Sequence, residues 1–254
     1  MNALIFCDID GCLSDGKNRA FDLPRLLEAR AVIARLAKHG IGFTLCTGRP
    51  QPFAEAVAQT LDSVLPLVCE GGALVYAPAT DTYLPVADSE SLRAIAEVER
   101  AIRAGDILTE DLYFEVGNAY SLCLTGPAIS DQSQRAIHAR MDDLKARFGA
   151  HPVAWSHSTT SVDITPQGIS KGSGVEAVCA RLGVPLDNTA GIGDSNGDLG
   201  LFAAAAHGYC PSNASPELQA QAVYVSPDPV LAGTLDILNR IADNPSVLLG
   251  NAPN

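Results

Sequence analysis

The sequence predicts an α/β fold, in which a doubly wound parallel sheet carries a smaller α+β domain inserted between its two halves. Two patterns predict it. In residues 1–79 and 167–254, short apolar runs alternate with amphipathic helical segments, which is typical of a parallel sheet covered by helices on both faces. In residues 80–166, the order helix, strand, strand occurs twice, which indicates an antiparallel sheet with helices on one face. We therefore expect a core domain of residues 1–79 and 167–254 and an inserted domain of residues 80–166.

Strands and helices alternate at the start of the core. Apolar runs predict strands over 4–7, 41–46 and 65–69, and a shorter one over 73–76. Helical spacing of apolar residues predicts helices over 24–38 and 52–61, and His39-Gly40 ends the first of them.

The middle of the chain changes character. Residues 78–85 are rich in turn formers and predict a hinge. Helices are predicted over 89–104 and 130–148, and strands over 112–116, 119–125, 152–156 and 161–165, with Gly117-Asn118 as a hairpin turn. The core pattern then resumes, with helices over 171–182, 201–205 and 230–241 and strands over 189–193, 209–210 and 223–225.

Composition limits the function. Hydrophobic residues make up 47% and charged residues 18%, as in ordinary soluble globular proteins, and no apolar run reaches membrane-spanning length or marks a signal peptide. The seven cysteines form no CxxC pair, which favours a reducing cytoplasmic location. A net charge of −12 without a basic stripe argues against a nucleic-acid partner. An anionic substrate would need a metal ion and a few placed basic residues.

The first strand stops at two aspartates, Asp8 and Asp10, followed by Gly11. Residues two apart on a strand point to the same side, so these carboxylates face one way and repel each other unless a proton or a cation intervenes. A bound Mg²⁺ would remove that conflict and could organise phosphate chemistry. A solvated turn is the simpler alternative for this tetrapeptide taken alone.

Three more polar clusters fall at the ends of predicted strands or the start of a helix: Thr47-Gly48-Arg49, Lys171 and Asp194 with Asp198. Ligands of open parallel sheets bind at that edge. The order DxDG, a strand ending in Thr, a Lys opening a helix, and GDSxxD resembles the haloacid dehalogenase-like (HAD) phosphohydrolases over nearly the whole chain. This resemblance implies a Rossmann-like HAD core, and the inserted αββαββ unit looks like the C2-type cap of subfamily IIB, the group of Cof and sucrose-phosphate phosphatase-like proteins.

The resemblance also implies an activity. The compact cap and the loop 210–214 look most like those of archaeal-type phosphoglycolate phosphatases, and sucrose-phosphate and mannosyl-phosphoglycerate phosphatases share much of the pattern. The expectation is therefore a Mg²⁺-dependent phosphatase that hydrolyses a small phosphorylated metabolite, phosphoglycolate or a sugar phosphate, through an aspartyl-phosphate. A sugar phosphomutase or phosphotransferase of the same fold is the alternative. Neither a nucleic acid nor a membrane is an expected partner, and the chain is expected to be a monomer or a homodimer.

Each site residue takes a role that the resemblance implies. Asp8 is the nucleophile, Asp10 the general acid and base, and Thr47 and Lys171 stabilise the transferring phosphoryl group. Mg²⁺ is held by Asp8, by the backbone carbonyl of Asp10 and by Asp194, with Asp198 as a ligand through water or as the residue that orients Lys171. The expected phosphate and substrate contacts are Thr47, Gly48, Arg49, Lys171 and Asn213.

Simpler alternatives stay open for several of these residues. Thr47 could only cap a helix, Arg49 could form an ion pair at the rim, and Asn213 could be a turn former. Two positions depart from the family pattern: Gly197 replaces the usual Asn, with Asn196 beside it, and Glu70-Gly71-Gly72 replaces Glu-Asn-Gly. The cationic residues on predicted cap helices are Arg93, Arg100, Arg103, Arg135, Arg140, Lys145 and Arg147.

Overall fold

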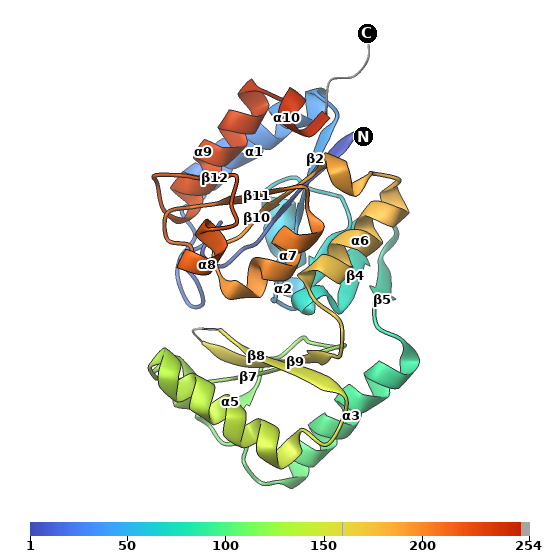
Figure 1. Cartoon of the computed structure of the whole chain (residues 1–254), viewed down its shortest axis with the longest axis vertical. Coiled ribbons are helices and arrows are strands. Elements are labelled where there is room, and N and C mark those ends of the chain that lie inside the picture. The colour runs from blue at the N-terminus through green and yellow to red at the C-terminus, as the bar shows by residue number, and fades with distance from the viewer. Residues whose placement is uncertain (159, 250–254) are drawn as a thin grey trace.

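A central sheet of five parallel strands, in the order β12-β11-β10-β1-β2, organises the computed structural model, which describes residues 1–158 and 160–249. Its strands are β1 (Ala3–Cys7), β2 (Ile41–Leu45), β10 (Thr189–Ile192), β11 (His207–Cys210) and β12 (Tyr224–Val225). Helices α1 (Leu23–Lys38) and α9 (Val230–Asp243) cover one face, and α6 (Lys171–Leu182) and α7 (Leu199–Ala204) cover the other (Figure 1). The predicted parallel α/β sheet is confirmed.

A short antiparallel sheet continues the core beyond β2. It consists of β3 (Leu67–Cys69), β4 (Leu74–Ala77) and β5 (Thr82–Pro85), and it joins β2 through a parallel bridge between Cys46 and Val68. Helix α2 (Gln51–Thr60) connects β2 to β3. The predicted hinge over 78–85 is wrong for its second half. A tight turn with Asp81 in the left-handed region (φ 46°) folds residues 82–85 back onto β4, so β5 stays with the core strands.

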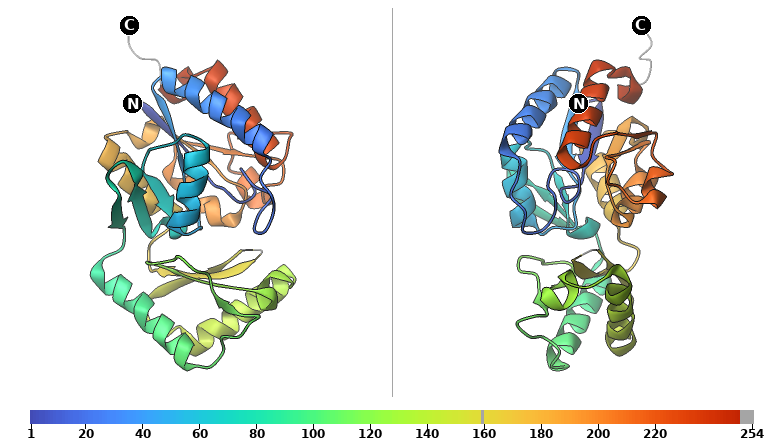
Figure 2. Two further views of the ribbon diagram at one scale, coloured as in Figure 1. Left: turned by 180° about the vertical axis from the view of Figure 1, so that it is seen from behind. Right: turned by 90° about the vertical axis from the view of Figure 1, so that its left-hand side faces the viewer.

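The inserted unit is an antiparallel sheet with two long helices on the side away from the core (Figures 1 and 2). The strands lie in the order β6-β7-β9-β8 and are β6 (Tyr113–Phe114), β7 (Leu122–Thr125), β8 (Val153–His157) and β9 (Ser161–Pro166). The helices are α3 (Ser89–Ala104) and α5 (Gln134–Phe148). The helix predicted over 130–148 begins four residues later than predicted, because Ser133 caps α5 by accepting the Ala136 N–H, and the short α4 (Pro127–Ser130) ends before it.

The two faces of this cap sheet differ in chemistry. Side chains alternate along each strand, so every second residue points to the same face. The helix-facing side packs Leu122, Leu124, Val162 and Ile164 into the apolar cluster with α3 and α5. The residues between them in register, among them Cys123 and Asp163, face the core domain. The cap therefore presents a polar surface to the core.

The remaining helices are short: α8 (Pro216–Gln219) and α10 (Ser246–Leu249). Within residues 1–158 and 160–249, none of the helices has both the length and the apolar character needed to cross a bilayer. All seven cysteines are buried and free.

A buried carboxylate links the core to the cap. Glu70 follows β3 with a left-handed backbone (φ 53°) and is only 1% exposed. Its carboxylate accepts the backbone N–H groups of Ala119, Tyr120 and Ser121 at 3.0, 2.8 and 2.9 Å, and the Ser121 hydroxyl at 3.1 Å. Burial raises the pKa of Glu70, and these hydrogen bonds oppose that rise. One core side chain thus binds three successive amides of the cap loop before β7.

Replacing this carboxylate is expected to loosen the cap. In Glu70→Ala the three amides lose their buried acceptor, which lowers the free energy of unfolding by about 1 to 3 kcal/mol. Hydrogen exchange of the amides of residues 119–121 should accelerate, while the exposed-site control Glu110→Ala leaves it unchanged. Unaltered exchange at these amides in Glu70→Ala contradicts the linking role.

Candidate active site

The two aspartates of the first motif lie where β1 ends. Asp8 is 6% exposed, and its Oδ2 lies 2.9 Å from the Lys171 Nζ. Its Oδ1 is buried and has no hydrogen-bond partner among the residues that the structure describes. Gly11 then turns the chain with φ 77°, at a position where a Cβ atom would overlap the Asp194 carboxylate. Only glycine allows this turn to pass so close to the neighbouring strand end.

Lys171 and Asp198 form a buried ion pair beside Asp8. Lys171 is the first residue of α6, and its Nζ contacts both Asp8 and Asp198. Asp198 is fully buried, and its other oxygen accepts the backbone N–H groups of Asp194 and Ser195 at 3.1 and 3.0 Å. Burial lowers the pKa of Lys171, but the charges of Asp198 and Asp8 outweigh it, so the net direction is upward. This geometry fits Asp198 as the residue that orients Lys171.

Three carboxylates meet at this point. One oxygen from each of Asp8, Asp194 and Asp198 lies within 4.8 Å of the others. Burial raises the pKa of Asp8 to about 7 and that of Asp194 to about 8, and the charges of neighbouring aspartates add to both shifts. Three ionised carboxylates would carry more negative charge than one lysine balances, and a hard divalent cation prefers such oxygen ligands. The donor set therefore fits a Mg²⁺ ion.

Asn213 braces this cluster. Its side-chain amide donates to the Gly11 carbonyl at 3.0 Å and approaches the Asp194 Oδ2 at 3.4 Å, while its oxygen accepts the Val230 N–H at 2.7 Å. These contacts tie the turn after β1 to the loop after β10. A phosphate-binding role for Asn213 stays a prediction.

The cluster after β2 lies beside Asp8. Thr47 is 1% exposed, and its hydroxyl oxygen accepts the Arg49 N–H at 3.1 Å, which leaves the hydroxyl hydrogen free to donate. A Cβ atom on Gly48 would meet no atom within 4 Å, so there is open space beside this glycine. Thr47 caps no helix, because α2 begins only at Gln51, with Pro50 as its cap residue.

Arg49 joins the site to the cap. Its Nε and Nη2 bind the two oxygens of Asp10 at 2.7 and 2.8 Å, and its Nη1 contacts Glu115 of the cap at 3.2 Å. The guanidinium also stacks over Phe53, 4.8 Å from the ring centre. Burial lowers the pKa of Arg49, but its contacts with Asp10 and Glu115 outweigh that and raise it. The sequence left open whether Arg49 contacts the substrate or forms an ion pair at the rim. In the structure Arg49 forms an ion pair, and this pair lies inside the site.

Two residues of this region, Lys17 and Glu115, were not singled out from the sequence. Lys17 reaches from the loop after β1 to Glu115 at 2.9 Å and to the Thr125 hydroxyl at 3.0 Å. Glu115 and Glu70 supply the other polar contacts between cap and core. No motif marks Lys17 or Glu115. Glu70 belongs to a recognised motif, yet only the tertiary contact gives it a partner.

The departures from the family pattern have local consequences. Asn196 accepts the Ser215 hydroxyl at 2.6 Å, so its side chain supports the loop after β10. A Cβ atom on Gly197 would meet only the Ser195 hydroxyl, at 3.3 Å. The cationic residues of the predicted cap helices lie on α3 and α5, on the far side of the cap sheet from the core (Figure 1).

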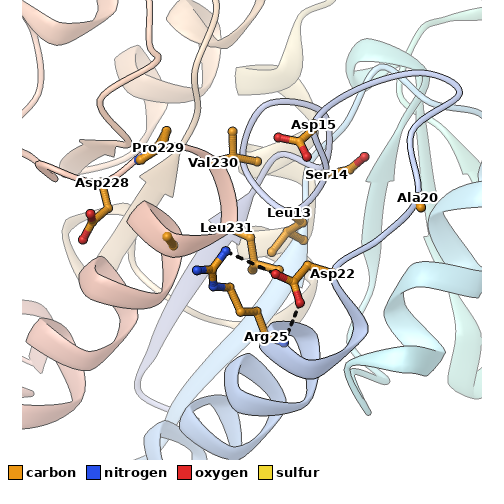
Figure 3. Close-up of a pocket in the computed structure, with 11 residues that line it drawn as sticks. Leu13, Ser14, Asp15, Ala20, Asp22, Arg25, Asp228, Pro229, Val230 and Leu231 are labelled. Carbon is orange, nitrogen blue, oxygen red and sulfur yellow. Dashed lines mark hydrogen bonds and ion pairs between the residues drawn. The ribbon is translucent and has the colours of Figure 1, made fainter.

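A separate cavity of about 270 Å³ opens on the core beside the loop after β1 (Figure 3). Ser14, Asp15 and Asp22 line it on one side and Asp228 and Val230 on the other, with Arg25 paired to Asp22 at 3.2 Å. None of the four motif clusters contributes a side chain to it. The candidate site of chemistry is the strand edge between core and cap, where the four motif clusters lie.

Comparison with known proteins agrees with this geometry. The family model for haloacid dehalogenase-like hydrolases matches residues 5–104 and 118–237. A phosphoglycolate phosphatase of Methanospirillum hungatei is 26% identical over 236 residues, covering 92% of this chain and 94% of that protein. The phosphoglycolate phosphatase of Halorubrum lacusprofundi is 29% identical, covering 91% of this chain and 93% of its own length.

Solved structures show the same fold. The Thermoplasma acidophilum protein 0175 superposes with a TM-score of 0.70 at 18% identity, covering 94% of this chain and 98% of its own. The sucrose-phosphatase of Synechocystis, solved with sucrose and phosphate, gives a TM-score of 0.67 at 20% identity, covering 96% and 98%. The chain therefore belongs to the haloacid dehalogenase-like hydrolases.

Proposed function

We propose that the protein is a Mg²⁺-dependent phosphatase that hydrolyses a small phosphate monoester through an aspartyl-phosphate on Asp8. One observation carries the proposal. The Asp8 carboxylate is held by Lys171 through one oxygen, while its other oxygen is buried and has no partner within residues 1–158 and 160–249, at the edge of the sheet where Thr47 and Asp194 also lie. A held carboxylate with one uncommitted oxygen is suited to nucleophilic attack.

The side chains then divide the work. Asp8 attacks phosphorus, so that a new bond forms between its oxygen and phosphorus while the bond to the leaving oxygen breaks. Both Asp10 oxygens pair with Arg49 in this structure, so Asp10 first releases Arg49 and takes up a proton from solvent, and it then gives that proton to the leaving oxygen. In the second step Asp10 takes a proton from water, whose oxygen attacks phosphorus, and phosphate leaves with the Asp8 carboxylate restored. The Thr47 hydroxyl and Lys171 donate hydrogen bonds to the phosphoryl oxygens in both steps.

Asp8, Asp194 and the backbone carbonyl of Asp10 would hold the metal ion, and Asp198 would orient Lys171 through their ion pair. When bound, Mg²⁺ supplies positive charge that offsets the repulsion between the Asp8 carboxylate and the phosphoryl oxygens. This positive charge is needed because the net charge of the chain, −12, repels a phosphate dianion.

The relatives' names support a small metabolite as substrate. The curated relatives compared above are phosphoglycolate phosphatases, and the Synechocystis neighbour acts on a phosphorylated disaccharide. Phosphoglycolate and a sugar phosphate are therefore the two candidate classes.

Release of inorganic phosphate from an aryl phosphate tests the proposal. With Mg²⁺ the protein should release phosphate over many turnovers, and removing the ion with a chelator should reduce the rate at least about a hundredfold, with recovery when Mg²⁺ is added back. Water must enter for this to occur, so a mutase or a phosphotransferase would release little phosphate. Turnover that is indifferent to the chelator contradicts the metal-dependent assignment.

A further inference from the structure

The cap surface above the site carries negative charge. Glu115, Cys123 and Asp163 lie next to one another across β6, β7 and β9: the Glu115 N–H donates to the Cys123 carbonyl, and Cys123 pairs with Asp163 in register. The Cys123 thiol donates to Glu115 at 3.2 Å, and the Ser161 hydroxyl donates to Asp163 at 2.9 Å. Segments 112–125 and 152–166, which supply the cap strands, contain no lysine and no arginine.

Two positive charges reach this surface from the core, and Glu115 binds both, while Arg103 of α3 lines a cavity with Glu115 and stacks on Phe114 at 4.9 Å. The Glu115 Oε1 lies 2.9 Å from the Lys17 Nζ and 3.2 Å from the Arg49 Nη1. The three side chains are largely buried, with exposed fractions of 17% for Glu115, 20% for Lys17 and 12% for Arg49. Burial raises the pKa of Glu115, but the bonds and charges of Lys17 and Arg49 outweigh it and lower the pKa, so Glu115 is ionised at neutral pH.

This arrangement disfavours a second anionic group on the substrate. Arg49 also donates from its Nε and Nη2 to Asp10, so its charge is shared between two carboxylates. A substrate carboxylate that bound Lys17 and Arg49 would have to displace Glu115 or lie in contact with it. Two carboxylates in contact repel each other strongly when they are shielded from water. Hydroxyl groups on the substrate are not repelled in this way. Carboxylates accept hydrogen bonds from them, and serine and threonine hydroxyls can donate to them or accept from them.

We propose that Glu115 is a specificity-determining residue that selects an uncharged, hydroxyl-bearing leaving group and rejects a leaving group that carries a carboxylate. This inference rests on the proposed function, since it names the substrate class of that same site. It divides the two candidate classes: sugar or polyol phosphates are substrates, and phosphoglycolate is a poor one.

Matched pairs of esters test the selection. Hydroxyethyl phosphate and phosphoglycolate have the same length and differ by a hydroxymethyl group against a carboxylate, as do glycerol phosphate and phosphoglycerate. In the wild-type protein kcat/KM should be at least about tenfold higher for the uncharged member of each pair. Equal values, or a preference for the carboxylates, overturn the proposal.

Glu115→Gln provides the second arm, because it keeps the shape and removes the charge. The substitution frees Lys17 and Arg49 for a substrate carboxylate. We therefore expect kcat/KM for phosphoglycolate to rise about tenfold, mainly through a lower KM, and kcat/KM for hydroxyethyl phosphate to fall or stay unchanged. Glu110→Gln, on the exposed part of the same domain, should change neither. If Glu115→Gln lowers kcat/KM for both substrates by the same factor, Glu115 only supports the structure.

The failure of this inference is separable from the failure of the function. Each variant is also assayed with an aryl phosphate, whose ring carries neither a carboxylate nor a hydroxyl for the cap surface to read. Asp8-dependent hydrolysis of that ester with a preference for phosphoglycolate would refute the role of Glu115 and leave the phosphatase mechanism standing.

Discussion

Asp8→Asn should abolish turnover, with kcat reduced by at least about ten-thousandfold for aryl and alkyl phosphates alike. The amide cannot form the phosphoryl ester, so the reaction loses its first step and not only part of its electrostatic support. The fold should survive, because Lys171 keeps its ion pair with Asp198. Steady-state phosphate release, with circular dichroism and the thermal midpoint as checks on folding, measures this.

The matched control is Asp15→Asn. Asp15 is an exposed aspartate in the same loop after β1, so its replacement changes the local charge by the same amount without touching the strand edge. It should keep activity within about twofold, in line with the small effects of surface substitutions. Asp8→Asn with activity near that of this control would contradict the nucleophile assignment.

Lys171→Met should harm both activity and stability. The loss of the charge that faces the phosphoryl group is expected to lower kcat about a hundred- to a thousandfold. Lys171 also lies between Asp8 and Asp198, with a side chain only 7% exposed, so its removal leaves two buried carboxylates without their cation. Breaking such a buried group of charges typically costs about 3 to 5 kcal/mol of unfolding free energy.

Denaturant unfolding and phosphate release together measure these two effects. Lys145→Met, at an exposed position of α5, removes the same charge from the cap and should change neither. Lys171→Arg keeps the charge with a different shape, so it should recover part of the stability and little of the rate. A Lys171→Met protein as stable and active as the Lys145→Met control would show that the lysine serves neither purpose.

Much of the fold follows from sequence patterns because the patterns are local. The helices over 89–104 and 171–182 begin and end as predicted, since Asp88 and Ser170 supply N-terminal caps and glycines follow both helices. The predicted hinge fails at 82–85 because the turn formers of this stretch form the turn of a hairpin, which folds residues 82–85 back onto β4. The helix over 130–148 was predicted too long because Ser133 caps a new helix inside an otherwise helical pattern.

The same distinction between local patterns and tertiary contacts applies to the site residues. Asp8, Thr47, Lys171 and Asp194 could be predicted, because each stands at the end of a strand or the start of a helix, and the topology of a parallel sheet brings those ends together. Lys17 and Glu115 could not, because one lies in an irregular loop and the other at the end of a cap strand. Only the packing of cap on core makes them neighbours. Residues that touch across a domain junction leave no local pattern.

Acid quenching during turnover, followed by peptide mass spectrometry, tests the central claim most directly. Under saturating aryl phosphate with Mg²⁺, the peptide that contains Asp8 should carry one added phosphoryl group on that aspartate. In Asp10→Asn the modified fraction should increase, because the base that activates water for the second step is gone. Sustained phosphate release in which Asp8 is never modified, in either protein, would contradict the account.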